Sequence, residues 1–348
     1  MAKDIDQRQL QSFQRYLQSS KKILCIVGAG LSASSGIPTY QLSKGSWKGY
    51  TSLDLATPEA FQQNPGLVWQ FYSSRRFASL KAKPNDGHFA LAELSRRLHE
   101  KQKEVLVVSQ NVDGLHQRSG QTVETLAELH GSLFNLRCTS FFCGYKGSNS
   151  KDLFLTARLR ETTPRELPAK SLRRGTNKRK RNEDESDEDN DSSQNPRKRI
   201  RLNAKACTQE DSATSSDFDP LPHLGLEELP RCPECNEGLL RPGVVWYGES
   251  LPLLEMDKVD RFFSQGHKVD LVLVIGTSGK VWPAMGYVER VKKTGGKVAI
   301  FNTTIEDLDR VRHDKTVWGF QGDAAEWLPK ALEPVIGRDY KPRDWLKR

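Results

Sequence analysis

Four short apolar segments constrain the fold of this chain more than any other feature. KKILCIV ends at residue 27, EVLVVS at 109, LVLVI at 275 and KVAIFN at 302, and turn-forming or polar residues follow each one. Stretches with apolar residues at three-to-four spacing, such as ALAELSRRLHE, lie between them and predict helices. Continuous apolar strands that alternate with helices are typical of a parallel sheet with helices on both faces. The sequence therefore predicts an α/β fold with a doubly wound parallel sheet.

The first strand runs into residues 28–33 (GAGLSA), which match the G-x-G-x-x-[G/A] pattern of a Rossmann-like dinucleotide-binding turn. Glycines at such a turn let backbone amides approach a pyrophosphate, and the helix that follows stabilises the negative charge. A glycine pair after a strand is also common in ordinary tight turns, so the motif alone is weak. The dehydrogenase version needs an acidic residue at the end of a second strand. The nearest candidate, Asp54, lies in TSLDLATP, which is not a strand pattern, and hydride transfer is disfavoured.

Polar residues also follow the other three strands, at 109–113 (SQNVD), 276–278 (GTS) and 302–304 (NTT). Ligands of open α/β sheets bind at the carboxyl ends of the strands. Four polar clusters that converge on one edge of a sheet are better explained by an extended polar ligand than by four ordinary loops.

Two cysteine pairs, Cys138 with Cys143 and Cys232 with Cys235, lie between the two halves of the predicted sheet. Four thiolates make a closed tetrahedral zinc site that has no open position for a water nucleophile. The second pair has the usual two-residue spacing. Four residues separate the first pair, which lies within the broader range of zinc knuckles. We expect one structural zinc ion in a small module set into the sheet domain.

Composition changes sharply between about residues 146 and 228, where the chain runs through KRKRNEDESDEDNDSSQNPRKRIR. Alternating charge blocks with few apolar residues bury too little surface to offset their ordering entropy, so we expect a long disordered insertion. Its basic clusters, 178–181 and 196–201, fit a solvated charge run and a bipartite signal for a nuclear import receptor equally well. The acidic run between them opposes direct nucleic-acid binding, which ranks last.

The predicted cellular compartment is reducing and intracellular. The chain has six cysteines in 348 residues, and paired cysteines in such a compartment bind metal more often than they form disulfides. No stretch approaches the roughly 18 apolar residues of a membrane span, and the N-terminus lacks a secretory core. Asp4 and Asp6, in a segment with no Arg-rich pattern, count against a mitochondrial transit peptide, so the sequence supports one only weakly.

His130 lies in ELHGSL, just before the first cysteine pair. A single histidine is more often structural than catalytic. Its place beside Gly131, at the junction between two modules, favours catalysis because ligands are commonly bound in such clefts. An imidazole can accept a proton near neutral pH, which makes His130 a candidate general base.

Taken in order, GAGLSASSGIPTY, SQNVDGLH, ELHGSL, the two cysteine pairs, LLRPGVVWYGE, VIGTS and FNTT resemble the sirtuin family of NAD-dependent protein deacylases. The resemblance covers roughly residues 20 to 335 without the insertion, and the ordered set is far more specific than any one motif. LATPEAF, NPGLVWQFYSSRR and RPGVVWYGES are similar to the class III branch, whose members prefer succinyl, malonyl and glutaryl groups.

The resemblance implies that NAD is consumed. The acyl-lysine oxygen attacks the nicotinamide ribose, nicotinamide leaves, and a histidine acts as base on a ribose hydroxyl so that the acyl group migrates to ADP-ribose. His130 matches that base. The residues implied to contact NAD are Gly28, Ala29, Gly30, Ser32, Ala33, Pro38, Thr39, Tyr40, Trp47, Gln110, Asn111, Val112, Asp113, Gly276, Thr277, Ser278, Asn302, Thr303, Thr304 and Ala324.

The resemblance also implies how an acylated lysine peptide is bound. The segment that pairs with the peptide as an added strand is matched by Val245, Trp246, Tyr247 and Gly248, a mode with loose sequence preference. Tyr72 and Arg75 match the class III pair in the acyl pocket. One helical turn places both on the same face, where a guanidinium clamps a carboxylate and a phenol adds a hydrogen bond. Without the resemblance, an amphipathic helix with a surface arginine is the simpler interpretation.

One departure from the family pattern concerns the cofactor. Sirtuins follow G-I-P-x-[F/Y] with an arginine, whereas this chain has Gln41 after Tyr40. Glutamine carries no charge, so we expect reduced NAD affinity or turnover, with Lys44 as a hypothetical source of the missing charge. Three alternatives stay open: a weak nuclear deacetylase, a non-catalytic NAD or ADP-ribose binding module, and a mono-ADP-ribosyltransferase.

The expected organisation divides the sheet domain into two parts. Its segments are an N-terminal helix or tail (1–19), the first part of the Rossmann-like domain (20–131) with a helical module (about 51–100), the zinc module with the insertion (132–240), the second part (241–335) and a tail (336–348). The basic clusters indicate the nucleus or cytoplasm, and the class III resemblance indicates the mitochondrion, so localisation stays open.

Overall fold

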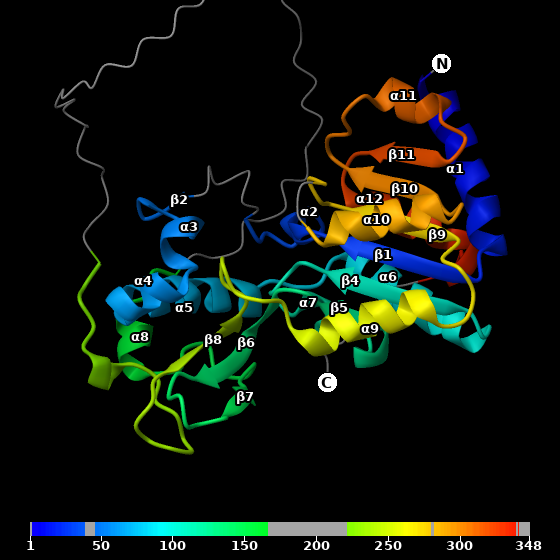
Figure 1. Cartoon of the computed structure of the whole chain (residues 1–348). Coiled ribbons are helices and arrows are strands. Elements are labelled where there is room, and N and C mark those ends of the chain that lie inside the picture. Colours follow the sequence, from blue (N-terminus) through cyan, green and yellow to red (C-terminus); the bar gives the residue numbers. More distant parts are fainter. Residues whose placement is uncertain (1, 39–45, 166–220, 280–281, 339, 341–348) are drawn as a thin grey trace, which may run out of the picture. The chain divides into compact units, whose positions relative to one another are not determined.

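The computed structural model describes residues 2–38, 46–165, 221–279, 282–338 and 340 (Figure 1). Several predicted features lie outside these residues. They are Thr39, Tyr40, Gln41, Lys44 and the basic clusters 178–181 and 196–201. All the other predicted site residues lie in the described part of the chain.

The larger sheet has six strands in the order β11-β10-β9-β1-β4-β5, and each neighbouring pair is parallel. The order reverses between β1 and β9, and ligands of open α/β sheets bind at the carboxyl ends of the strands at such a reversal. The predicted doubly wound fold is confirmed. The strands are β1 (Lys22–Val27), β4 (Glu104–Ser109), β5 (Leu126–Glu128), β9 (Leu271–Ile275), β10 (Lys297–Asn302) and β11 (Val317–Gln321).

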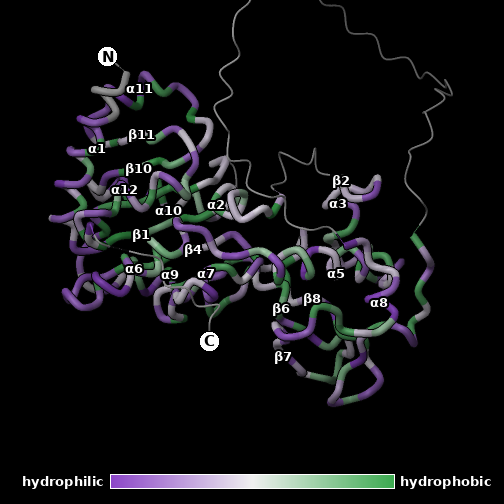
Figure 2. Tube along the Cα trace, turned by 180° about the vertical axis from the view of Figure 1, so that it is seen from behind, coloured by the Kyte–Doolittle hydropathy of each residue, from purple (hydrophilic) through white to green (hydrophobic). Residues whose placement is uncertain are grey.

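Helices cover both faces of this sheet because its strands are apolar on both sides. Ile23, Cys25 and Val27 of β1 face one core, and Leu24 and Ile26 face the other. The first core is closed by α1 (Ala2–Ser19), α6 (Asp86–Glu100) and α12 (Ala324–Ile336), and the second by α9 (Leu253–Ser264) and α10 (Ala284–Lys293). Hydrophilic and hydrophobic residues alternate along α1, as expected for a helix with one buried face (Figure 2).

Short helices lie next to the strand ends. They are α2 (Ala29–Ala33) after β1, α7 (Leu115–Arg118) after β4, the 3-10 turn η1 (Val123–Thr125) before β5, and α11 (Leu308–His313) after β10. None of the helices in the described part of the chain combines the length and apolar character needed to cross a bilayer.

A smaller lobe has its own hydrophobic core, in which helices pack on a three-stranded antiparallel sheet of order β7-β6-β8. Its long helix α5 begins at Pro65 because the Asn64 side chain accepts a hydrogen bond from the Leu67 amide. The elements of this lobe are β2 (Ser46–Trp47), β3 (Tyr50–Thr51), α3 (Ser52–Leu55), α4 (Pro58–Gln63), α5 (Pro65–Lys81), β6 (Gly131–Cys138), β7 (Lys146–Ser148), α8 (Ala157–Thr162), η2 (Leu226–Glu228) and β8 (Leu240–Val244).

The expected insertion from about 146 to 228 overlaps ordered structure at both of its ends. Its first part contains β7 and α8, and Leu159 of α8 is buried in the core of the smaller lobe. Its last part contains η2, with Leu224 buried in the same core. Secondary structure and buried residues therefore extend further into both ends of this segment than composition alone predicts.

Candidate functional site

The turns after β1 and β9 touch through their backbones. The Gly30 amide donates a hydrogen bond to the Gly276 carbonyl at 2.8 Å. A Cβ added to Gly28 would lie 2.7 Å from the Gly276 oxygen, and one added to Gly30 would lie 2.7 Å from the Gly276 Cα. Only glycine fits either position without moving the β9 turn. Backbone thus packs directly on backbone between the two turns. Turns without side chains are also what close approach of a phosphate requires.

A buried polar network joins the β1 turn to the β4 turn. Ser32 Oγ donates to Asp113 Oδ2 at 2.6 Å, and Asn111 Nδ2 donates to Ser32 Oγ and to the Gly28 carbonyl at 3.1 Å each. Asp113 Oδ1 also accepts from the Leu115 amide at 2.9 Å. Burial raises the pKa of Asp113, and the hydrogen bond from Ser32 opposes that rise. The network fixes three predicted cofactor-binding side chains in one geometry.

His130 lies between β5 and β6 with a defined tautomer. Its Nδ1 is 2.9 Å from the Gln110 carbonyl, which only accepts hydrogen bonds, so Nδ1 carries the proton and Nε2 keeps its lone pair. Burial lowers the pKa of His130, although the bond to Gln110 works in the other direction. The ring is therefore neutral near pH 7, the state in which it can act as a base.

The backbone around His130 is held on both sides. Its carbonyl accepts a hydrogen bond from the Val245 amide at 2.9 Å. Gly131 follows with φ +71°, and a Cβ there would lie 2.2 Å from the Gly243 carbonyl oxygen. A residue with a side chain would be strained at this position and would push β8 away.

The polar residues continue along the same edge of the sheet. Thr277 Oγ1 donates to Gln110 Oε1 at 3.2 Å, and Asn302 Nδ2 donates to the Thr277 carbonyl at 3.0 Å. The Thr303 amide donates to Asn302 Oδ1 at 2.9 Å. Hydrogen bonds therefore connect His130 to the ends of β4, β9 and β10, and the structure brings together the strand-end clusters that the sequence singles out.

The remaining predicted cofactor residues lie in several environments. Pro38, Ser278 and Thr304 are exposed, Ala33 and Val112 are half-buried, and Ala324 is buried at the start of α12. Asp323, which caps α12, accepts from Ser34 Oγ and so ties α12 to the segment after α2. Trp47 does not belong to the strand-end clusters. It packs in the core of the smaller lobe, with its ring centroid 5.4 Å from that of Phe71.

Tyr72 and Arg75 flank Phe71 on α5. The Tyr72 ring packs edge-on against Phe71 at 4.9 Å, and the Arg75 guanidinium lies 5.2 Å from the centre of the same ring. Tyr72 is buried and Arg75 is half-buried. Among the described residues, Arg75 forms no ion pair and no hydrogen bond. An arginine without a carboxylate partner in a partly buried setting is suited to bind an anion.

The segment expected to pair with a peptide already uses most of its amides inside the chain. The Val245 amide donates to the His130 carbonyl, the Trp246 amide to Glu249 and the Tyr247 amide to the Ala56 carbonyl. An added peptide strand would therefore pair through the carbonyls of this segment or from Gly248 onward. Gly248 has φ +85° and open space around it.

The four cysteines converge on one point. Their Sγ atoms all lie within 4.8 Å of one another, with 3.6 Å between Cys138 and Cys235 and 3.7 Å between Cys143 and Cys232. A zinc ion with four Zn–S bonds of about 2.3 Å gives S–S distances of about 3.8 Å, so the cluster fits structural zinc. Four residues separate Cys138 from Cys143. Two of them, Phe141 and Phe142, are each 94% exposed, so the longer spacing does not keep the two Sγ atoms out of the cluster.

Sequence reasoning missed Glu128, which ends β5 two residues before His130. Burial raises the pKa of Glu128 to about 7, with nearby Glu255 and Asp113 adding to the rise. The sequence signal that could identify Glu128 as a site residue is its position at the end of a strand. That signal cannot be used, because β5 itself is not evident from the sequence.

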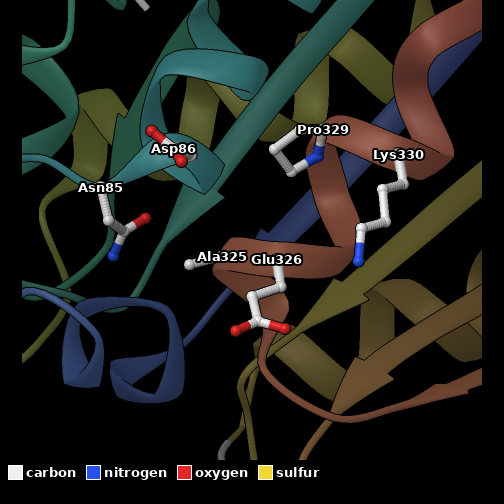
Figure 3. A pocket seen from close by; sticks show the side chains of 6 residues that line it. All are labelled: Asn85, Asp86, Ala325, Glu326, Pro329 and Lys330. Atoms are coloured by element: carbon white, nitrogen blue, oxygen red, sulfur yellow. The ribbon is translucent and has the colours of Figure 1, made fainter. Parts of the chain in front are cut away.

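A hollow between the N-terminus of α6 and α12 is separate from these residues (Figure 3). Its lining contains none of the strand-end residues and mixes carboxylates with a lysine, so we do not include it in the site. The lining residues are Asn85, Asp86, Ala325, Glu326, Pro329 and Lys330.

Comparison with known proteins gives a consistent result. The model of the Sir2 family matches residues 28–173 and 176–283. The chain is 48% identical over 330 residues to an NAD-dependent protein deacylase of Candida albicans, which covers 95% of this chain and 99% of that protein. It is 36% identical over 324 residues to the mitochondrial NAD-dependent protein deacylase sirtuin-5 of Canis lupus familiaris, which covers 92% of this chain and 84% of that protein.

Solved structures agree with the sequence comparison. The crystal structure of a Sir2 homologue in complex with NAD has a TM-score of 0.62 at 28% identity, over 95% of this chain and 93% of that chain. A mutant Sir2 homologue in complex with 2′-O-acetyl ADP-ribose has a TM-score of 0.61 at 28% identity, over 92% and 94%.

Proposed function

Because the chain belongs to the Sir2 family, we propose that it is an NAD-dependent protein-lysine deacylase that prefers acyl groups ending in a carboxylate, namely succinyl, malonyl or glutaryl. Acyl-lysine, NAD and water are converted to lysine, nicotinamide and O-acyl-ADP-ribose. The observation that carries the acyl preference is the half-buried Arg75 guanidinium, which has no acidic partner among the described residues. It contacts the Phe71 ring, which the Tyr72 ring also contacts.

His130 is the proposed general base of this reaction. Its Nδ1–H is engaged by the Gln110 carbonyl, which leaves Nε2 to accept a proton from a ribose hydroxyl. Burial keeps the ring neutral before the reaction. The Ser32–Asn111–Asp113 network would hold the ribose and nicotinamide half of NAD, and the glycine turns after β1 and β9 would approach its phosphates.

The zinc ion has a structural part in this proposal. Cys138 ends β6, the strand that starts at Gly131 beside His130, and Cys232 and Cys235 precede β8, whose following residue Val245 bonds to the His130 carbonyl. A zinc ion held by four thiolates would keep β6 and β8 paired and so keep His130 in place. It would not touch the reacting atoms.

Two alternatives are weaker on structural grounds. A non-catalytic NAD or ADP-ribose module would not need a neutral histidine with a fixed tautomer or the buried Ser32–Asp113 bond. A mono-ADP-ribosyltransferase would have no need of Arg75 and Tyr72 as an acyl pocket. A weak nuclear deacetylase differs only in acyl preference and localisation.

Tagged full-length protein, compared with a version lacking residues 173–201, tests whether the basic clusters direct it to the nucleus.

Product analysis separates these functions. Purified protein is incubated with NAD and a succinyl-lysine peptide, and the products are identified by mass spectrometry, with His130→Ala as the control. We expect free lysine peptide, nicotinamide and O-succinyl-ADP-ribose, all lost in the control. A peptide or protein that carries ADP-ribose would support the transferase, and NAD binding without products would support the binding module.

A further inference from the structure

Three tryptophans are buried in the core of the smaller lobe, and two of them use their indole N–H groups inside the chain. Trp69 Nε1 donates to the Leu240 carbonyl and Trp246 Nε1 to the Tyr72 hydroxyl oxygen, at 2.9 Å each. Trp47 is 3% exposed, and its buried Nε1 has no hydrogen-bond partner among the described residues. Buried N–H groups are almost always paired, because an unpaired one costs stability. The Trp47 N–H thus points to a partner that the described residues do not supply.

Short local structure fixes the backbone of Trp47. The residue ends β2, which pairs with β3 across a two-residue turn of Lys48 and Gly49, with φ of +50° and +86°. Left-handed backbone at both turn residues is typical of hairpins whose twist matches that of their strands. Thr51 then caps α3 through a reciprocal pair of hydrogen bonds with Asp54. A hairpin followed directly by a capped helix holds the Trp47 backbone in one place.

The Trp47 indole contacts the same aromatic ring as the Arg75 guanidinium. The centroids of the Trp47 and Phe71 rings are 5.4 Å apart, and the Arg75 guanidinium lies 5.2 Å from the centre of the Phe71 ring. An indole N–H and a guanidinium only donate hydrogen bonds, and neither has an acceptor among the described residues. A ligand group that only accepts hydrogen bonds fits this arrangement.

We propose that Trp47 is a specificity-determining substrate contact: its indole N–H donates to the terminal carboxylate of the acyl group that Arg75 binds. This inference rests on the proposed acyl preference. A carboxylate has about four acceptor sites, and a guanidinium bound in two-point fashion leaves some of them open. A carboxylate taken out of water is costly unless it is fully hydrogen-bonded, and the Trp47 N–H fills one open site. An acetyl group ends in a methyl and offers this N–H no charged acceptor.

Trp69 provides a matched control in the same core. Its indole N–H already has a partner, so Trp69→Phe breaks an existing hydrogen bond, whereas Trp47→Phe removes an N–H that has none. Both changes remove the same atoms and keep an aromatic ring. The melting temperature should therefore fall more in Trp69→Phe, while acyl selectivity should fall only in Trp47→Phe.

The test measures kcat and KM for matched succinyl-lysine and acetyl-lysine peptides, and KM for NAD, in the wild type, Trp47→Phe, Trp69→Phe, Arg75→Met and the double variant of Trp47 and Arg75. We expect Trp47→Phe to lower the succinyl-to-acetyl ratio of kcat/KM about tenfold, mainly through KM for the peptide, because a hydrogen bond to a charged group is lost. In the Arg75→Met background the same change should alter the ratio by less than about twofold, since the carboxylate is no longer held beside the indole.

An unchanged ratio in Trp47→Phe would overturn the inference. Combined with a raised KM for NAD, that result would make Trp47 a cofactor contact, and combined with a melting temperature as low as that of Trp69→Phe, a packing residue. Losses that multiply in the double variant would also contradict a shared carboxylate. If Arg75→Met abolishes succinyl preference while Trp47→Phe leaves it intact, the Trp47 contact alone fails. If the wild type shows no succinyl preference, the acyl proposal fails as well.

The wild type gives a second measurement that needs no substitution at Trp47. Its seven indole N–H groups are followed by ¹H–¹⁵N spectroscopy during titration with each peptide without NAD, so that no turnover occurs. We expect one indole resonance, which Trp69→Phe and Trp246→Phe assign to neither of those residues, to shift downfield with the succinyl peptide and not with the acetyl peptide. The same response to both peptides would overturn the inference even if Trp47→Phe does not fold.

Discussion

The Gly30 amide and the Gly276 carbonyl, 246 positions apart in the chain by their numbers, are hydrogen-bonded at 2.8 Å. This bond seats the turn after β1 on the turn after β9, at the point where the strand order of the sheet reverses. Both turns are predicted to face the phosphates of NAD, so the shape of the cofactor site depends on a contact that leaves no room for a Cβ.

Gly30→Ala is expected to weaken NAD binding strongly and to destabilise the fold. The new Cβ would lie 2.7 Å from two backbone atoms of Gly276, which cannot rotate away, and overpacking of this kind costs about 1–3 kcal/mol. Calorimetric NAD titration and urea unfolding measure the two effects. Gly144→Ala is the control, because a Cβ there would have no described atom within 4 Å. Unchanged NAD affinity in Gly30→Ala would contradict the close-contact account.

The acid limb of the pH–activity profile should reflect His130. Burial lowers its pKa from the usual 6.5, so the ring remains neutral, and competent as a base, as the pH falls to 6.5. Activity is lost only when the pH drops through the lowered value and the ring takes up a proton. Measurement of kcat/KM between pH 5 and 9 tests this. An acid limb centred above pH 6.5 would assign it to another group.

Removal of zinc should inactivate the enzyme through the smaller lobe. The four Sγ atoms converge from β6 and from the segment before β8, so a zinc ion would tie the two together. His130 directly precedes β6, and its carbonyl accepts a hydrogen bond from Val245, which directly follows β8. We expect about one zinc per chain by elemental analysis, loss of activity on treatment with a chelator, and recovery when zinc is returned. Cys235→Ser should lower both zinc content and melting temperature. Full activity in zinc-free protein would show that the cluster is dispensable.

Glu128→Gln is expected to remove a pH-dependent cost to stability. Burial raises the pKa of Glu128 from 4.5 to about 7, so between these values the folded state binds more protons than the unfolded state and stability falls as pH rises. The full effect is at most about 3 kcal/mol, since one pKa unit corresponds to about 1.4 kcal/mol and partial exposure reduces it. Urea unfolding of both proteins at pH 5 and pH 8 spans most of this change. The free energy of unfolding of the variant, relative to that of the wild type, should be higher at pH 8 than at pH 5. The same pH dependence in both proteins would count against the raised pKa of Glu128.

The sequence predicts the centre of the large sheet better than its edges. The strands β1, β4, β9 and β10 are continuous apolar runs and are confirmed. The edge strand β5 has only three residues, Leu126–Glu128, inside TVETLAEL, a pattern equally typical of a helix. The other edge strand, β11 (VWGFQ), is interrupted by Gly319, which weakens a strand pattern because glycine adds no side chain to pack.

The sequence also places the polar residues at strand ends, but it does not give their partners. Tautomer and hydrogen-bond direction depend on atoms from distant segments, such as the Gln110 carbonyl at His130. Trp246 and Tyr72 are separated by 174 positions, and no local pattern pairs them. The cysteine spacing predicts the metal cluster more directly, because the ligand chemistry itself restricts how four thiolates converge.

In the proposed function, Arg75 selects a carboxylate-bearing acyl group. The most direct measurement compares kcat/KM for otherwise identical succinyl-lysine and acetyl-lysine peptides in the wild type and in Arg75→Met. We predict that the wild type favours the succinyl peptide, and that the variant loses at least about tenfold on that peptide, because a charged hydrogen bond contributes about 1.5–3 kcal/mol, while acetyl turnover is kept. A wild type that favours the acetyl peptide, or a variant that keeps the same succinyl-to-acetyl ratio, would contradict the claim.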